Sequence, residues 1–80
     1  MKIYNENGKM IGAACNYCGK IILQEQGVLK EDFASFRKEW GYFSDKDGIT
    51  HTFDLCEACY DQITGAFQIP IHTEETKELL

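Results

Sequence analysis

The sequence predicts a small α+β domain with one or more β-hairpins and a single helix towards its C-terminal end. Its four cysteines form two Cys-x-x-Cys pairs, which are typical of small domains held together by a metal ion. Residues 49–55 alternate apolar with polar side chains, as strands do, and an apolar repeat over 56–67 has helical spacing. A chain of 80 residues is enough for one domain, so we expect 1–80 to be a single unit with a compact core over about 13–68.

The N-terminal stretch contains a turn motif between two short apolar segments. Asn5-Glu6-Asn7-Gly8 separates residues 2–4 from residues 9–14. An Asn-Gly pair tolerates the positive φ angles of a tight hairpin turn. We therefore predict a weak hairpin over about 1–12, and a frayed N-terminal segment is the alternative.

The first cysteine pair has the form of a zinc knuckle, Cys15-Asn16-Tyr17-Cys18-Gly19-Lys20. Two residues between the cysteines allow a tight turn to direct both sulfurs at one ion. Gly19 suits the left-handed conformation that turns the next amide back towards a sulfur. The following Ile21-Ile22-Leu23 predicts a short strand that leaves the knuckle.

The stretch over 28–43 fits two periodicities. Its large apolar residues recur with helical spacing, yet it is rich in aromatic residues and runs towards the turn motif Asp47-Gly48. The strand pattern over 49–55 is the strongest in the chain and needs an antiparallel partner. The nearest candidate is 33–43, so we predict a hairpin from these two segments. A helix over 30–39 is the alternative.

The second cysteine pair is predicted to open the helix. Asp54 is a good N-cap residue and Glu57 follows three residues later, which is the pattern of a capping box. The positive end of the helix dipole favours thiolate over thiol at this position. One helix face would then carry both sulfurs and the apolar side chains of the core; this face comprises Cys56, Cys59, Tyr60, Ile63 and Phe67.

Pro70 prevents the helix from continuing beyond Ile69. We expect an extended chain over 69–72, followed over 73–80 by either one more helical turn or a loose tail. Its apolar end residues, Leu79 and Leu80, are expected to be frayed rather than docked.

One structural zinc ion is predicted to bind all four cysteines. Its ligands would be Cys15, Cys18, Cys56 and Cys59. Paired Cys-x-x-Cys motifs are specific for zinc, and four thiolates leave no position open for water or substrate. Iron is the main alternative metal, and two disulfides or a redox-active pair are the alternatives without one. The beginning of the chain lacks an apolar signal segment and no apolar run is long enough for a membrane span, so we expect a cytoplasmic location, where thiols stay reduced.

The predicted order of knuckle, strand, hairpin and ligand-bearing helix resembles a treble-clef zinc finger. The resemblance is based on C-x2-C-G-K at 15–20 and D-L-C-x2-C at 54–59. The chain also resembles small bacterial four-cysteine proteins of unassigned role, through Trp40-Gly41-Tyr42, Asp47-Gly48 and the stretch 51–59. Both resemblances imply a zinc-stabilised fold, and neither implies an activity.

The charge distribution favours a protein partner over a nucleic acid. The net charge is −5, and residues 44–80 alone hold two lysines against eight acidic residues, a balance of −6. Such a field repels phosphate backbones and favours basic partners. We therefore predict a protein-interaction module, an adaptor, regulator or inhibitor. Its contact surface would be the hairpin residues Trp40, Tyr42 and Phe43 together with the acidic Asp45, Asp47, Asp54 and Asp61.

Two other functions compete with this prediction. Aromatic residues interleaved with bases could stack single-stranded nucleic acid, the bases being Lys20, Lys30, Arg37 and Lys38. We expect instead that these aromatics form the small core between hairpin and helix, because so short a chain has few other large side chains to bury. A thiol redox switch that releases zinc on oxidation is the third candidate. We expect His51 to be partly buried near the knuckle and His72 to be solvated. No catalytic motif occurs, so an enzyme is not expected.

Overall fold

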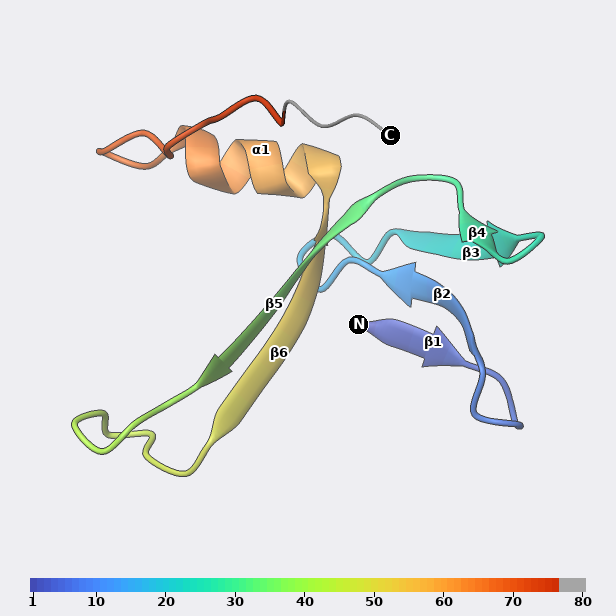
Figure 1. Ribbon diagram of the computed structural model, residues 1–80, viewed down its shortest axis with the longest axis horizontal. Coiled ribbons are helices and arrows are strands. Elements are labelled where there is room, and N and C mark those ends of the chain that lie inside the picture. Colours follow the sequence, from blue (N-terminus) through green and yellow to red (C-terminus); the bar gives the residue numbers. More distant parts are fainter. Residues whose placement is uncertain (77–80) are drawn as a thin grey trace.

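The computed structural model describes residues 1–76 and shows an α+β fold of antiparallel strands and one helix (Figure 1). The first four strands form a sheet in the order β1-β2-β3-β4, and β5 and β6 form a separate two-stranded ribbon. The elements are β1 (Lys2–Tyr4), β2 (Met10–Ala14), β3 (Ile21–Glu25), β4 (Val28–Leu29), β5 (Phe33–Glu39), β6 (Thr50–Cys56) and α1 (Glu57–Gly65). The fraying predicted for Leu79 and Leu80 lies outside the described residues.

The predicted N-terminal hairpin is confirmed, because β1 and β2 pair antiparallel. Asn5 holds its turn by accepting hydrogen bonds at Oδ1 from the amides of Asn7 (2.9 Å) and Lys9 (3.0 Å), and Gly8 adopts a φ of +80°. The strand predicted over 21–23 is also confirmed, runs two residues further and pairs with β2. It then pairs with β4, a strand of only two residues that the sequence did not predict.

The predicted ribbon of β5 and β6 is confirmed, and the alternative helix over 30–39 is wrong. The two strands pair without a break from Phe33 opposite Cys56 to Glu39 opposite Thr50. The prediction that the first strand extends to residue 43 is wrong, because the strand ladder ends at Glu39 and the chain then forms a loop. We call residues 40–49 the tip loop.

Helix α1 begins immediately after β6, and its N-cap is Cys56, which makes no side-chain capping hydrogen bond. The predicted capping box of Asp54 and Glu57 is therefore wrong. Asp54 belongs to β6, and its carboxylate is bound elsewhere. The helix ends at Gly65, so the prediction that Phe67 shares the helix face is also wrong. Phe67 lies beyond the helix and is 49% exposed.

The core is small and lies where the ribbon, the knuckle and the start of α1 meet. The buried cluster is Cys15, Leu55, Cys56 and Cys59, with Phe33, Tyr60 and Ile63 packed against it. Three of its four buried members are cysteines, so sulfur occupies space that larger apolar side chains fill in bigger domains. A core of this size needs a further source of stability, as small domains generally do.

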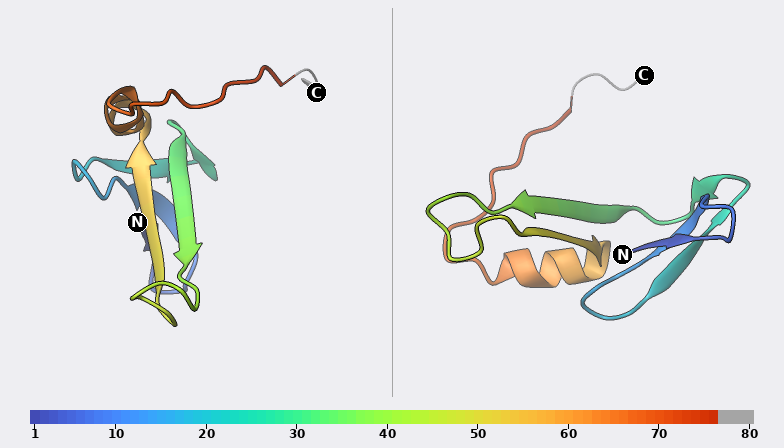
Figure 2. Two further views of the ribbon diagram at one scale, coloured as in Figure 1. Left: turned by 90° about the vertical axis from the view of Figure 1, so that its left-hand side faces the viewer. Right: turned by 90° about the horizontal axis from the view of Figure 1, so that it is seen from below.

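The aromatic residues of the ribbon extend this core along the helix rather than forming its centre. Phe36 stacks on Phe53 across the two strands with ring centroids 5.0 Å apart, and on Tyr60 of α1 at 6.3 Å. Both phenylalanines remain partly exposed, at 38% and 41%. Figure 2 shows α1 running beside the ribbon while the four-stranded sheet lies at one end of it. Within residues 1–76, no helix has the length and apolar character required to cross a membrane.

Candidate metal centre

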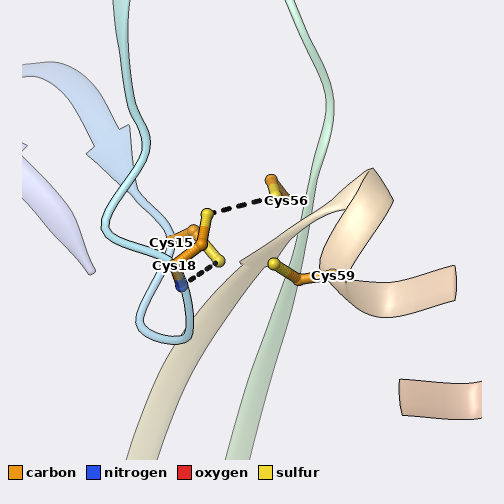
Figure 3. Close-up of side chains that lie close together, drawn as sticks. All are labelled: Cys15, Cys18, Cys56 and Cys59. Carbon is orange, nitrogen blue, oxygen red and sulfur yellow. Dashed lines mark hydrogen bonds between the residues drawn. The ribbon is translucent and has the colours of Figure 1, made fainter. Parts of the chain in front are cut away.

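The four predicted ligands converge on one point, although the two pairs are far apart in the sequence (Figure 3). All four cysteines are free, and their sulfurs lie within 4.8 Å of one another. The Sγ atoms of Cys18 and Cys56 are 3.8 Å apart. A tetrahedral ion with sulfurs at about 2.3 Å separates those sulfurs by about 3.8 Å. The cluster therefore fits one metal ion held by four thiolates.

The knuckle turns its backbone amides towards the sulfurs. The Cys18 amide donates to Cys15 Sγ, and the Lys20 amide donates to Cys18 Sγ, both at 3.5 Å. Gly19 makes the second contact possible by adopting a φ of +82°, as its position in the sequence predicts. The positive ends of these amide dipoles face the sulfurs, which favours the thiolate form that binds a metal.

The thiols differ in acidity according to their surroundings. Burial raises the pKa of Cys15, but hydrogen bonds from the backbones of Cys18, Cys56 and Tyr17 outweigh that effect and lower it to about 6. Burial, together with the neighbouring thiols, raises the pKa of Cys59 to about 12. Cys15 therefore ionises readily and Cys59 resists ionisation, as expected where several thiols share one site without a countercharge.

Three of the four cysteines of the site are shielded from solvent. Cys15, Cys56 and Cys59 are buried, whereas Cys18 is exposed. Solvent therefore reaches the cluster from the knuckle side. A metal ion bound there by all four thiolates would keep no open position for a substrate.

A second polar cluster fixes the knuckle against β6. The Asn16 amide donates to the Asp54 carbonyl oxygen at 2.8 Å, and the Asp54 amide donates to Asn16 Oδ1 at 3.0 Å. The edge of β6 is thus paired with the residue that follows Cys15. This pairing lies two residues before Cys56, so it brings the two halves of the metal site together.

The Asp54 side chain, which is buried, completes that cluster. Its carboxylate accepts hydrogen bonds from Lys2 Nζ, the Met1 amino group and Ser35 Oγ, each at 2.5 Å. Burial raises the pKa of Asp54, but these three donors and the charge of Lys2 lower it to about 2. This role could not be predicted from sequence, because the donors come from the N-terminal residues Met1 and Lys2 and from β5. Because its side chain is buried, Asp54 does not belong to the acidic contact surface that was predicted.

The histidines are not part of the metal centre. His51 is exposed and lies towards the far end of β6, where its Nδ1 accepts a hydrogen bond from Trp40 Nε1 at 3.2 Å. The predicted burial of His51 near the knuckle is therefore wrong. His72 is exposed as predicted, and its Nε2 lies 2.7 Å from a carboxylate oxygen of Glu74.

Most of the residues predicted to contact a partner lie in the tip loop, at the opposite end of the ribbon from the cysteines (Figure 1). Asp61, by contrast, is exposed on α1 and does not belong to this group. Tyr42 is 79% exposed and Phe43 is fully exposed, and their rings meet edge to face at 5.2 Å. Asp45 and Asp47 are also exposed. Trp40 is half-buried, with Lys46 Nζ 4.4 Å from the centre of its ring.

Hydrogen bonds within the tip loop hold it in one conformation. Trp40 donates its amide to the carbonyl oxygen of Ile49 (3.0 Å), and Ser44 donates to that of Gly41 (2.9 Å). The Lys46 amide donates to Ser44 Oγ at 3.0 Å. Tyr42 and Phe43 are therefore displayed by an ordered turn, not by a strand as the sequence predicted.

Most of the bases predicted for nucleic-acid binding already have acidic or aromatic neighbours. Lys20 Nζ lies 2.7 Å from a Glu31 oxygen, and an Arg37 nitrogen lies 2.8 Å from a Glu39 oxygen. Lys38 Nζ lies over the Trp40 ring at 5.5 Å. The positive charges of these bases are therefore dispersed among separate contacts and do not form a basic groove.

Comparison of the chain with protein-family models, curated proteins and solved structures finds no match. The resemblance to treble-clef fingers and to small bacterial four-cysteine proteins therefore remains a prediction. What the chain itself defines is a small α+β domain with four cysteines positioned to bind a metal ion.

Proposed function

We propose that this protein is a non-enzymatic module in which one structural zinc ion holds the fold and the tip loop binds a partner protein. A closed set of four thiolates is typical of structural zinc in small domains. Such a site offers no coordination position for a substrate, which supports a role other than catalysis. The proposal therefore separates the metal, which stabilises the fold, from the surface that carries the function.

The exposure of Tyr42 and Phe43 on an ordered loop carries the proposal. Neighbouring aromatic side chains that are both largely exposed often mark an interaction site, and aromatic side chains are prominent among the residues that dominate the binding energy of protein interfaces. The ordered loop lowers the entropy lost on binding. The exposed Asp45 and Asp47 follow the two aromatic residues in the same loop, so the partner surface that fits best is an apolar pocket with a basic rim.

Zinc is the metal we propose, and elemental analysis tests it directly. The expected result for protein purified without added metal is one zinc ion per chain. Iron in place of zinc, or protein free of metal with two disulfides, would contradict the metal part of the proposal. This measurement is independent of any partner.

Affinity purification from a lysate of the encoding organism tests the partner surface. The bait is the zinc-loaded chain, compared with the double variant Tyr42→Ala/Phe43→Ala. The matched control is Ile21→Ala/Val28→Ala, which removes apolar side chains that are 58% and 60% exposed from the other sheet. We expect specific proteins to bind the wild type and the control equally and to be lost from the tip-loop variant.

Two results would count against this function. One is recovery of the same proteins by the tip-loop variant. The other is tight, salt-sensitive binding of single-stranded nucleic acid in a filter-binding assay, which would favour the nucleic-acid alternative.

A further inference from the structure

The side chains of Trp40 and His51 connect the tip loop to β6. Trp40 Nε1 donates a hydrogen bond to His51 Nδ1 at 3.2 Å, and the two rings meet edge to face with their centroids 6.1 Å apart. An indole N–H can only donate, so His51 Nδ1 must supply a free lone pair and the proton of the ring must be on Nε2. The contact therefore requires a neutral histidine.

Protonation of His51 would remove this hydrogen bond. Both ring nitrogens of an imidazolium ion carry a proton, so Nδ1 would become a donor that faces the N–H group of Trp40. Histidine is the side chain that ordinarily gains or loses its charge between about pH 5 and pH 8. The contact between β6 and the Trp40 ring is therefore sensitive to pH within that range.

Two lysines around the rings would oppose a positive charge on His51. Lys38 is the cross-strand partner of His51, so their side chains lie on the same face of the ribbon. Lys38 Nζ lies 5.5 Å from the centre of the Trp40 ring, and Lys46 Nζ lies 4.4 Å from it. An imidazolium ion at His51 would be repelled by both ammonium groups, and the repulsion adds to the loss of the hydrogen bond.

No acidic residue offsets this repulsion by pairing with His51. Within residues 1–76, none of the ion pairs involves His51. Arg37 and Glu39 of β5 pair with each other and lie on the opposite face of the strand from Lys38. The other acids of β6, the tip loop and α1 are Asp54, Asp45, Asp47, Glu57 and Asp61.

Trp40 transmits the state of His51 to the tip loop. Its ring is half-buried beneath the Lys46 ammonium group, and its amide binds the Ile49 carbonyl oxygen at the base of the loop. Tyr42 and Phe43 follow two and three residues later. A loop that has lost the anchorage of the indole ring samples more conformations, so it loses more entropy when a partner binds.

We propose that protonation of His51 loosens the tip loop and weakens partner binding, so that the protein holds its partner at neutral pH and releases it in mildly acidic conditions. A proton from solvent adds to Nδ1 of His51, and the indole N–H of Trp40 is then left to bind water. The effect on partner binding rests on the proposed function of the tip loop. The change within the loop itself does not.

An NMR titration of the zinc-loaded full chain from about pH 7.5 to about pH 5.5 tests the loop without any partner. Trp40 is the only tryptophan of the chain, so its indole N–H gives a single signal. We expect this signal to shift with the same midpoint as the ring of His51. Unchanged signals from residues 15–19, with constant zinc content, establish that the metal site is intact throughout.

The two histidines of the chain provide a matched pair of variants. His51→Gln offers Trp40 an amide oxygen that does not titrate, and His72→Gln removes the exposed histidine that contacts Glu74. We expect the Trp40 transition in the wild type and in His72→Gln, and no transition in His51→Gln. At the acidic end, the amides of Ser44 and Lys46 should exchange with solvent about threefold to tenfold faster in the wild type than in His51→Gln, which corresponds to the loss of one hydrogen bond.

Three results would overturn the proposal for the loop. They are a Trp40 signal that does not follow the titration of His51, a transition that survives in His51→Gln, and a transition that His72→Gln abolishes. Equal amide exchange in the wild type and His51→Gln would also contradict it, because the loop would then be equally ordered in both states.

Affinity purification at about pH 7.5 and about pH 5.5 tests the effect on partner binding. We expect the wild type to recover about threefold to tenfold less partner at the lower pH and His51→Gln to recover equal amounts at both. Recovery by the wild type that matches His51→Gln at both values would overturn this part. Failure of the proposed function is distinguishable, because Tyr42→Ala/Phe43→Ala would then retain the partner while the Trp40 transition persists.

Discussion

The two ends of the β5–β6 ribbon are built on the same pair of strands but differ in what holds them. At the Cys56 end, the ribbon is bound to the knuckle through Asn16, to β1 through Asp54 and to α1 through the buried cysteines. At the other end, the hydrogen bonds of the tip loop are local to residues 40–49 and its neighbour His51.

This difference indicates that the two ends of the hairpin have different roles. Buried sulfur and hydrogen bonds between distant segments are concentrated at the Cys56 end, so stability depends on that end. The tip loop contributes little to the core, and its side chains are free to serve recognition, as loops on rigid scaffolds commonly do. Substitutions at the two ends should therefore separate into those that unfold the protein and those that leave it stable.

The largest effect is expected at the metal centre. Replacing any one of the four cysteines by serine should unfold the domain, because the free energy of metal binding here is folding free energy. Thermal melts followed by circular dichroism, with zinc content measured on the same samples, check this. A single Cys→Ser variant that melts cooperatively near the wild-type temperature would contradict the assignment of that cysteine.

The next effect is expected at Asp54. Asp54→Asn weakens the charged hydrogen bonds from Lys2 and the Met1 amino group and should lower the free energy of unfolding by about 2–3 kcal/mol. Denaturant unfolding of the zinc-loaded protein measures this loss in the free energy of unfolding. Asp45→Asn removes the same charge from the tip loop and should change stability by less than about 0.5 kcal/mol. Equal effects at the two sites would remove the contrast between the two ends.

The pH dependence of the stability difference between the wild type and Asp54→Asn sharpens this prediction. The pKa of Asp54 falls on folding to about 2, so its contribution is complete above the ordinary value of 3.8 and is lost as the pH falls through about 2. The stability difference between the wild type and Asp54→Asn should therefore be constant from about pH 7 to pH 5. A difference that shrinks within that range would show that Asp54 titrates at a higher pH.

A smaller effect is expected from two glycines, one at each end. Gly19 has a φ of +82°, so Gly19→Ala should cost about 1–2 kcal/mol and weaken metal binding. Gly41 in the tip loop has an ordinary φ and open space around the position of a Cβ atom. Gly41→Ala should therefore be close to neutral. Competition with a zinc chelator measures the first effect, and unchanged affinity in Gly19→Ala would argue against the amide contacts to sulfur.

The smallest effect on stability is expected at the most exposed side chain. Phe43→Ala should change the free energy of unfolding by less than about 0.5 kcal/mol, because the ring is fully exposed. Denaturant unfolding is again the measurement. A loss above 1 kcal/mol would mean that the tip loop stabilises the fold and is not a free recognition surface.

The parts of the fold that could be predicted depend on neighbours in the sequence. The alternation over 49–55, the Asn-Gly turn and the glycine after Cys18 each specify a local conformation, and all three are found. The end of β5 could not be predicted in this way. Tyr42 and Phe43 belong to residue types that favour strands, yet the pairing of Trp40 with Ile49 closes the hairpin before them.

The candidate metal site was predictable for a different reason. Cys-x-x-Cys spacing is a local pattern with one dominant chemistry, so the four ligands could be named before their positions were known. Asp54 was misinterpreted because its capping pattern is also local, whereas its actual partners, Lys2 and Asn16, lie 52 and 38 residues away in the sequence. Contacts of that kind leave no periodic trace in a sequence.

Reversible metal removal tests the central claim most directly. The protein is stripped with a chelator under reducing conditions, its thermal melt is recorded, and one equivalent of zinc is then returned. We expect the cooperative melt to vanish without metal and to return with one zinc ion per chain, since the core is largely sulfur. A metal-free chain that keeps its cooperative melt would contradict the claim that four thiolates and one ion hold this fold together.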